Sequence, residues 1–349
     1  MPATQTNFPL TRRGLLLGAG ALGLTAGQGR ARAGEASARR FFRIASGSSG
    51  GMYYPLAGLI SAAISNPTGD GDCSVEAVCG VPGLMAVAQT SAGSLDNLER
   101  LLSREVESAF CQADLALLCA KGEVAGLPLD LGKRLRAIGY LYPEVLHVVT
   151  RNGAGITLLA DLVGKRVSLG ARGSGTDRDA AVFLESFGLA KGSIARANLS
   201  SVAAAREIRE GTLDAFLLVS GVPANTVSSL AQDQLVSLLP LSGIGADRFV
   251  RLRPPYRTSI IQSGIYPHVA ATPSLSVGAL WLVTEDLSAE LVYEITQSLW
   301  SQATTDYLAQ NDTPLGPQIS LNNALTDIGT PPLHQGAKRF YEEVGLLSA

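Results

Sequence analysis

Small polar residues recur wherever a β-rich run of this sequence gives way to a helical run. Glycines and side chains with hydroxyl or amide groups fill these junctions, which fall at residues 46–54, 90–97, 111–114, 170–176 and 220–225. A helix start presents unpaired backbone N–H groups and about half a positive charge, and glycine lets the backbone approach a ligand closely. Several such starts together would hold a small anion without any lysine or arginine.

Each junction taken alone also suits an ordinary helix cap. Ser174 has the residue type of an N-cap, and Pro223 is expected at the first position of a helix. Asp114 would either cap a helix or accept a bond from a ligand amine. The ring of Tyr53 would either pack in the core or close a pocket. The prediction of a binding site therefore depends on the junctions lying close together.

Catalytic and metal-binding patterns are weak in this sequence. The segment 47–51 lacks the Gly-Lys-Ser/Thr ending of a phosphate loop and the spacing of a dinucleotide turn. A Gly-x-Ser-x-Gly elbow in the right context is not found, and Cys111 has no evident histidine partner. The three histidines, His147, His268 and His334, lie far apart, and no Cys or His pair has ligand spacing. We expect a binding protein, not an enzyme, with no metal and no cofactor.

Composition bounds the class of protein. The chain has 349 residues, of which 46% are apolar, so two domains with buried cores are expected. Charged residues make up 17% and the formal net charge is −2. A nucleic-acid-binding protein would normally carry a basic excess on one face, so no nucleic-acid partner is expected.

The N-terminus reads as an export signal. Arg12 and Arg13 precede an apolar run over residues 15–26, and Ala31-Arg32-Ala33 has the small-x-small spacing of a cleavage site. The run is too short to span a bilayer, and the paired arginines favour the twin-arginine route. We therefore predict a signal peptide at residues 1–33 and a mature, mildly acidic protein in the periplasm.

Four cysteines belong to a chain bound for an oxidising compartment, namely Cys73, Cys79, Cys111 and Cys119. Four cysteines permit three full pairings. A local Cys73–Cys79 bridge is favoured, and the segment between them must then turn, because six extended residues would hold them too far apart. Cys111 and Cys119 are expected as buried thiols, although a second bridge remains open.

Strands and helices alternate along the chain, which is typical of βαβ proteins. Strands are predicted over residues 41–46, 84–90, 106–111, 136–142, 145–151, 167–169, 215–219, 235–239 and 276–283. Helices are predicted over 54–64, 95–102, 115–121 and 177–187, up to Gly211, from Pro223 through Leu230, and over 289–309 and 334–344. A break is expected at 142–144. The carboxyl ends of parallel strands meet at one edge of a sheet, where ligands bind, so the junctions should converge there.

The motifs of these stretches together resemble the TAXI family of solute receptors for tripartite ATP-independent periplasmic (TRAP) transporters. The resemblance covers about residues 43–346 and is carried by short segments in a specific order: 47–56, 93–97, 112–114, 142–147, 174–176, 211–216, 221–223 and 332–337. The segment 73–82 looks longer than the commonest family pattern, which puts the identity of the ligand in doubt.

The resemblance implies an α/β type II periplasmic-binding-protein fold, in which two α/β lobes are joined by two crossing hinge strands. Lobe 1 would comprise residues 41–144 and 274–349, and lobe 2 residues 145–273, with crossings at 145–151 and 272–283. The family binds small acids, including glutamate-like amino acids and dicarboxylates, and delivers them to a membrane permease. The implied ligand-binding residues are Ser48, Tyr53, Ser94, Asn97, Gln112, Asp114, Ser174, Thr176, Gly221 and Pro223.

Two alternatives stay open at this point. One is an enzyme on the same two-lobed scaffold, because a fold does not fix a function. The other is an exported sensor module that binds a ligand and signals to a membrane kinase. The ligand itself, a role for a cation and the oligomeric state are left open by the sequence.

Overall fold

The computed structural model describes residues 39–69, 80–311, 315 and 318–348. The predicted signal peptide (residues 1–33) and the predicted Cys73–Cys79 bridge lie outside these residues. Cys111 and Cys119 lie within them, and both are buried free thiols, as expected for two of the four cysteines.

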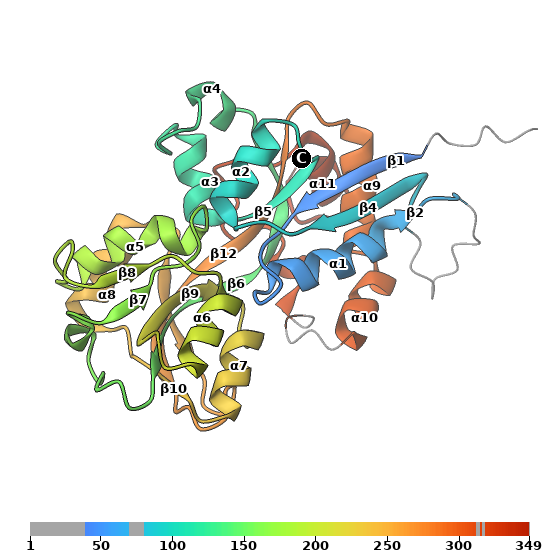
Figure 1. Cartoon of the computed structure of the whole chain (residues 1–349). Coiled ribbons are helices and arrows are strands. Elements are labelled where there is room, and N and C mark those ends of the chain that lie inside the picture. Colours follow the sequence, from blue (N-terminus) through green and yellow to red (C-terminus); the bar gives the residue numbers. More distant parts are fainter. Residues whose placement is uncertain (1–38, 70–79, 312–314, 316–317, 349) are drawn as a thin grey trace, which may run out of the picture. The chain divides into compact units, whose positions relative to one another are not determined.

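The described strands form one mixed sheet of ten strands and a separate two-stranded pair (Figure 1). The main sheet has the order β4-β1-β5-β12-β6-β9-β7-β8, with β10 beside β6 and β11 beside β12. The strands are β1 (Arg40–Ala45), β2 (Ser65–Asn66), β3 (Val81–Pro82), β4 (Leu84–Gln89), β5 (Ser108–Gln112), β6 (Leu135–Arg151), β7 (Arg166–Ser168), β8 (Ala195–Ala197), β9 (Ala215–Ser220), β10 (Val236–Leu238), β11 (Arg257–Ile261) and β12 (Thr272–Thr284).

Helices follow most of these strands along the chain, as the sequence pattern predicts. They are α1 (Tyr53–Ile64), α2 (Ser94–Leu102), α3 (Ala113–Ala120), α4 (Leu129–Gly132), α5 (Gly175–Ser186), α6 (Ser201–Arg209), α7 (Asn225–Gln232), α8 (Gly243–Leu252), α9 (Ala289–Leu299), α10 (Gln302–Gln310) and α11 (Gln335–Glu343).

The first lobe is built on the parallel strands β4, β1 and β5. Alternate residues of a strand point to opposite faces of a sheet, and here both faces are covered. Phe42 and Ile44 of β1 pack in a buried cluster with Leu56 of α1 and with residues of α9 and α11, whereas Ala45 joins a cluster with Leu98 of α2. The carboxyl-terminal helices therefore return to the lobe that the first strand begins.

The second lobe is built on β9, β7 and β8, which also run parallel to one another. Phe216 of β9 packs with Ile208 of α6 and with Val227 and Leu230 of α7 on one face. On the other face, Leu217 lies in the same cluster as Phe183 of α5 and Phe249 of α8. Each lobe is thus a helix-covered parallel sheet, and the carboxyl ends of its strands share one edge.

Strands β6 and β12 run through both lobes and pair with each other in antiparallel register. The predicted break at residues 142–144 is wrong, because β6 continues for 17 residues. Pro143, which cannot donate a ladder hydrogen bond, lies opposite Gly278 in a stretch of regular pairing. The register shifts come beyond it, between Ala279 and Leu280 and between Trp281 and Leu282. The strand therefore runs through the proline without ending.

Other differences from the sequence prediction concern short elements. The single helix predicted over 289–309 is two helices, because the chain turns at Trp300 and Ser301 begins a new cap, accepting a hydrogen bond from the Thr304 amide at 3.2 Å. The prediction also missed the helices α4 and α8 and the short strands β2, β3, β8 and β11.

Candidate ligand-binding site

The carboxyl edges of both lobes border one cavity of about 110 Å³, several times the space that one water molecule needs. Within the described residues, the N-caps of five helices line it: Met52 (α1), Gly93 (α2), Gln112 (α3), Ser174 (α5) and Ser200 (α6). Three of these helices belong to the first lobe and two to the second. The amide-rich ends of both lobes therefore face the same small space.

The lining is neutral apart from one carboxyl group. None of the described lining residues is Lys, Arg or His, and Glu144 is the one acidic residue among them. The remaining polar groups are hydroxyls and amides, including those of Ser48, Ser201 and Ser220. The cavity thus offers hydrogen-bond donors and helix ends in place of basic side chains.

Glu144 lies on β6, where the strand passes between the lobes, and its side chain is buried. The hydroxyl of Tyr53, at the start of α1, donates a hydrogen bond to Glu144 Oε2 at 2.6 Å. Burial raises the pKa of Glu144 to about 8, and the bond from Tyr53 lowers it. Burial together with the neighbouring carboxyl also raises the pKa of Tyr53 well above its usual value.

Six of the ten candidate residues line the cavity: Ser48, Tyr53, Ser94, Gln112, Ser174 and Thr176. Several of them also hold the walls together. Ser94 Oγ accepts a bond from the Gln112 amide at 3.1 Å, Ser174 Oγ caps α5 by accepting from the Asp177 amide at 3.0 Å, and Thr176 Oγ1 accepts from the Val219 amide at 3.1 Å. These hydroxyls fix the helix starts against the strands.

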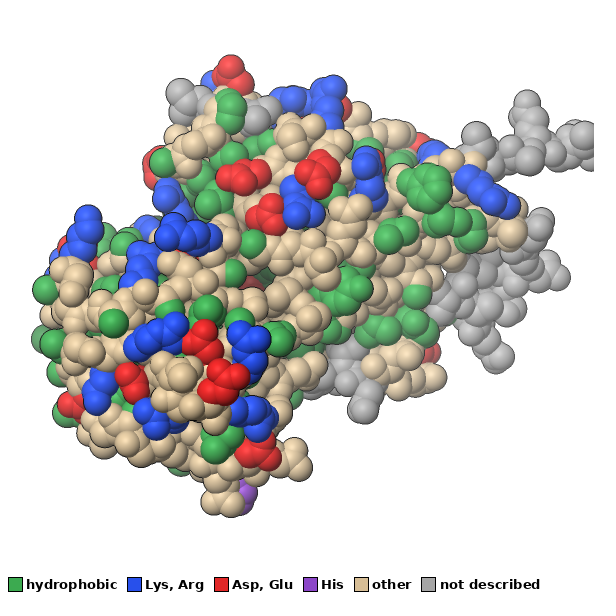
Figure 2. All heavy atoms as spheres, in the orientation of Figure 1, with side chains coloured by type: hydrophobic (Ala, Val, Ile, Leu, Met, Phe, Trp, Pro, Cys, Tyr) green, Lys and Arg blue, Asp and Glu red, His purple; other side chains and the backbone are tan. Residues whose placement is uncertain are grey.

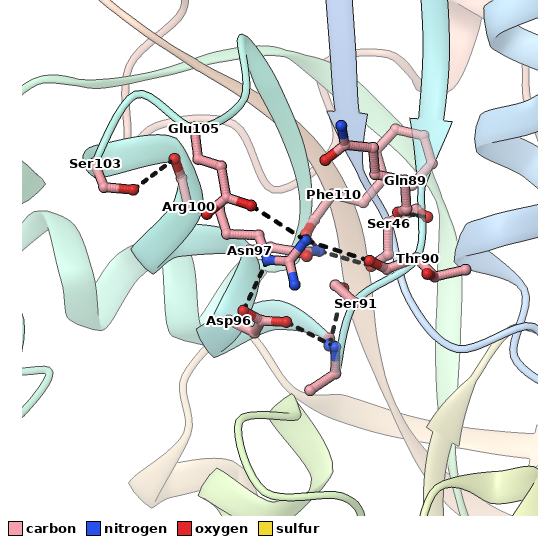
Figure 3. Close-up of polar contacts among 12 residues, drawn as sticks. Ser46, Gln89, Thr90, Ser91, Asp96, Asn97, Arg100, Ser103, Glu105 and Phe110 are labelled. Carbon is pink, nitrogen blue, oxygen red and sulfur yellow. Dashed lines mark hydrogen bonds and ion pairs between the residues drawn. The ribbon is translucent and has the colours of Figure 1, made fainter.

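Asn97 does not line the cavity. It lies beneath the lining, where its Nδ2 donates to the carbonyl oxygens of Ser46 at 2.6 Å and of Phe110 at 2.7 Å (Figure 3). Helix α2 is thereby tied to the ends of β1 and β5. Asp96 on the same helix accepts from the Ala92 amide at 2.9 Å and pairs with Arg100. The role of Asn97 in this structure is to position the wall.

Asp114 also lies outside the cavity lining. It is fully buried on α3, and its nearest cation is Arg253, whose Nε lies 3.8 Å from Asp114 Oδ2 and 2.7 Å from Asp179 Oδ1 on α5. Burial and the neighbouring Asp179 raise the pKa of Asp114 well above its usual value. Tyr256 donates to Asp179 at 2.9 Å and accepts from Gln112 Nε2 at 3.0 Å, so this cluster connects the lobes behind the cavity.

Gly221 and Pro223 follow β9 but do not line the cavity. A Cβ on Gly221 would lie 2.9 Å from a methyl group of Leu315 and 3.0 Å from the ring of Tyr142, so a larger residue would displace these side chains. Pro223 forms a cis peptide bond with Val222. The expectation that Pro223 starts a helix is wrong, because α7 begins at Asn225 with Ala224 as its N-cap.

Contacts between the lobes surround the cavity. The hydroxyl of Thr226 donates to the Gly50 carbonyl at 2.8 Å, and the hydroxyls of Ser48 and Ser201 lie 3.4 Å apart. The amides of Leu95 and Asp96 both donate to the carbonyl of Gly173 at 3.0 Å. These bonds join loops from opposite lobes, so the described arrangement is a closed one.

The ten candidates leave out five polar residues of the lining, namely Ser91, Glu144, Ser200, Ser201 and Ser220. Glu144 was assigned to a break between strands, although a carboxyl inside a long apolar run is itself a signal of a buried functional group. Ser220 Oγ is buried without a hydrogen-bond partner, and its residue pairs with Val145, the neighbour of Glu144, between β9 and β6. Ser201 begins α6 and could have been found as a helix start.

Outside the cavity, charged side chains of opposite sign are mixed. On the face shown in Figure 2, basic and acidic side chains alternate over both lobes. Many charged side chains of the described residues form ion pairs, as Arg209 does with Asp233 and Arg166 with Glu207. This face carries no broad basic surface of the kind that nucleic acid requires.

Comparisons with known proteins give one family and several solved structures that are similar to this chain. The model of a family described as the NMT1-like family matches residues 44–345. A solved structure from Bordetella bronchiseptica RB50 is 16% identical, with a TM-score of 0.50 over 87% of this chain and 82% of that one. Less similar are the alkanesulfonate-binding protein SsuA from Xanthomonas axonopodis pv. citri bound to MOPS, at 14% identity and TM-score 0.43 over 79% and 80% of the chains, and the ligand binding component of an ABC-type import system from Staphylococcus aureus, at 10% and 0.47 over 88% and 93%.

The fold predicted from the sequence is confirmed. Two α/β lobes are joined by the crossing strands β6 and β12, which is the arrangement of the two-lobed periplasmic-binding-protein fold.

Proposed function

This chain belongs to the NMT1-like family, and from that premise and the geometry of its cavity we propose that it is a receptor that captures a small organic acid or amino acid. The observation that carries the proposal is the convergence of five helix N-caps from both lobes on one small cavity. A carboxylate placed there would receive backbone N–H bonds and the favourable field of several helix ends.

The resemblance to the TAXI family supports a finer version of this proposal. In it, the ligand is glutamate-like or a dicarboxylate, and the receptor hands it to a TRAP membrane permease from the periplasm. The paired arginines of the leader support export by the twin-arginine route. Among the described residues, we find no helix with the length and apolar character that crossing a membrane requires.

Capture without turnover is the proposed chemistry. Ser49 stands at the centre of the spacing Gly47-x-Ser49-x-Gly51, but it is exposed and does not line the cavity. His147 is buried against Tyr266 with its Nε2 2.8 Å from the tyrosine hydroxyl, and His268 is exposed. These positions give Ser49 no histidine base of the kind a serine nucleophile needs.

Ligand-driven closure is the proposed mechanism. An open form would admit the ligand to the helix starts of one lobe, and closure about β6 and β12 would bring the second set of helix starts onto it. The contacts between Gly50 and Thr226 and between Gly173 and the start of α2 would then form. The closed surface would be the one that the permease recognises.

A calorimetric screen of carboxylates and amino acids on the mature protein tests this proposal, with two matched cap variants. Ser174→Ala removes the cap of α5 at the cavity, and Ser288→Ala removes the cap of α9, where Ser288 accepts from the Leu291 amide at 3.4 Å. Each should cost about 1 kcal/mol of stability. Ser174→Ala should also weaken ligand binding, by about 1–3 kcal/mol if a buried bond is lost, whereas Ser288→Ala should leave the affinity unchanged. Ser94→Ala, which also alters the cavity wall, should weaken binding by a similar amount.

Two results would count against the proposal. One is a screen in which no small acid or amino acid binds. The other is an affinity that is unchanged in both Ser94→Ala and Ser174→Ala, because the ligand would then sit elsewhere. Uptake of the identified ligand by the permease in proteoliposomes, dependent on this receptor, tests the transport step.

A further inference from the structure

The carboxyl group of Glu144 is the one acidic side chain among the described residues that line the cavity. Its residue is 3% exposed, and its one hydrogen-bond donor is the hydroxyl of Tyr53 at 2.6 Å from Oε2. No lysine, arginine or histidine of the described lining faces it. An ionised carboxylate at this depth needs a cation, and the described lining residues supply none, so a cationic group of the ligand could take that place.

The groups packed around Glu144 do not supply a charge. Its titratable neighbours are Tyr53 on α1, Cys111 on β5, Tyr140 and Tyr142 on β6 and Tyr256 after α8, and burial raises the pKa of each above its usual value. All five are neutral near pH 7. The hydroxyl of Ser220, which also borders the cavity, is buried without a partner. A cationic group of the ligand that donates hydrogen bonds could bond to both the Ser220 hydroxyl and the Glu144 carboxyl.

We propose that Glu144 binds an ammonium group of the ligand, so that this receptor selects a zwitterionic amino acid over acids that lack an amine. The inference rests on the proposed function and decides between its two ligand classes. The carboxylate of the ligand would lie at the helix starts, and its ammonium would lie beside Glu144 and the hydroxyl of Ser220. An amine-free dicarboxylate would instead bring a second negative charge toward a carboxyl that has no cation.

Selection by Glu144 has a defined proton balance. With the cavity empty, the raised pKa of about 8 leaves the carboxyl largely protonated at pH 7. An ammonium beside it lowers that pKa, so binding releases close to one proton to solvent. Affinity for an amino acid should therefore rise with pH up to about 8. The affinity for an amine-free anion should change with pH in the opposite direction. It should fall over the same pH range, because the ionised Glu144 repels the anion.

Matched pairs of ligands test the proposal directly. Calorimetry would compare L-glutamate with 2-hydroxyglutarate, and L-leucine with 2-hydroxyisocaproate, at pH 6, 7 and 8.5 in buffers of different ionisation enthalpy. Within the pair that binds, the amino acid should bind at least tenfold more tightly than its hydroxy analogue. Its affinity should increase with pH, and close to one proton should be released at pH 7.

Glu144→Gln supplies the second arm of the test. This variant should bind the amino acid at least 100-fold more weakly, bind the hydroxy acid within about threefold of the wild type, and lose the pH dependence between pH 6 and 8.5. Glu107→Gln is the matched control, because Glu107 is bonded to Arg43 away from the cavity, and its affinities should equal those of the wild type. Thermal melting of each variant establishes that it is folded.

The outcomes separate this proposal from the proposed function. Hydroxy acids or dicarboxylates that bind as tightly as amino acids, an affinity that falls as pH rises, or an unchanged Glu144→Gln variant would each overturn the role of Glu144 while the receptor function stands. Binding of no acid or amino acid at all would instead remove the proposed function and this inference with it.

Discussion

The Thr226 hydroxyl donates to the carbonyl oxygen of Gly50 at 2.8 Å, and this bond joins the first turn of α7 in one lobe to the loop after β1 in the other. Gly50 has no room for a side chain here. A Cβ would lie 2.6 Å from Val202 Cγ2 and 2.8 Å from both Ser201 Oγ and Thr226 Oγ1. The close approach of the lobes therefore depends on the absence of one methyl group.

Gly50→Ala should hold the lobes apart and weaken ligand binding about tenfold or more, which corresponds to about 1.4 kcal/mol. Its thermal midpoint without ligand should stay close to that of the wild type, because neither core changes. Calorimetry measures the affinity, and small-angle scattering should show less compaction on ligand addition. Gly58→Ala, on the exposed side of α1 with nothing within 4 Å of its Cβ, is the control and should bind normally. Equal affinity in both variants would show that this contact does not limit closure.

Arg253→Met should destabilise the protein by about 3–5 kcal/mol, because it leaves Asp114 and Asp179 buried without their cation. Urea unfolding measures the loss. Asp114→Asn in the Arg253→Met background should recover part of it, since one of the two carboxyls is then removed. Asp114→Asn alone should change ligand affinity less than threefold, because Asp114 does not line the cavity. A large loss of affinity there would restore Asp114 as a ligand-binding residue.

Much of the fold follows from local sequence patterns. The helix starts at Tyr53, Ser94 and Gly175 and the strand ends that precede them could be predicted, because glycine and hydroxyl residues mark them in the chain. Parallel pairing then brings these junctions to one edge of each lobe. Six of ten candidate residues line the cavity for this reason.

The rest depends on long-range pairing. Pro143 predicts a break when read alone, but β6 continues through it, opposite Gly278 of β12. Glu144 reaches the cavity because β6 is continuous there. The wrong prediction of a break at Pro143 is therefore also the reason that Glu144 is not among the candidate residues. Asn97 and Asp114 have the residue types of ligand-binding groups. In the fold, Asn97 instead bonds to Ser46 and Asp114 lies beside Arg253, where both help to position the walls of the cavity.

Acid should destabilise the protein through His147, which is buried on β6. Ala224 donates its amide to the Tyr266 hydroxyl at 2.8 Å, so that hydroxyl donates to His147 Nε2, and Nδ1–H donates to the Val145 carbonyl at 2.8 Å. This arrangement holds the ring neutral, and burial lowers its pKa to about 4. Between pH 6.5 and 4 the unfolded chain binds a proton that the folded protein does not, so stability falls on acidification by about 1.4 kcal/mol per pH unit.

Urea unfolding from pH 7 to pH 4.5 measures this dependence. His147→Gln should unfold at lower urea at pH 7 yet show a shallower decline with acid, because the titrating group is gone. His268→Gln, at an exposed position, should keep the wild-type slope. The same slope in all three proteins would assign the acid sensitivity to other groups.

Glu144 should destabilise the empty receptor at alkaline pH. Its pKa of about 8 in the folded protein lies above the value near 4.5 expected in the unfolded chain, so between these values the folded protein holds a proton that the unfolded chain has lost. Stability must then fall as pH rises from about 4.5 to 8. Glu144→Gln lacks this titration, and its advantage over the wild type should grow by roughly 2–4 kcal/mol between pH 5 and pH 9. Urea unfolding at both pH values measures the difference. A bound amino acid should reduce this difference in stability between the variant and the wild type, because an ammonium beside the ionised carboxyl removes the cost of burying that charge. A difference that stays constant at all pH values would mean that Glu144 is already paired with a cation of the protein.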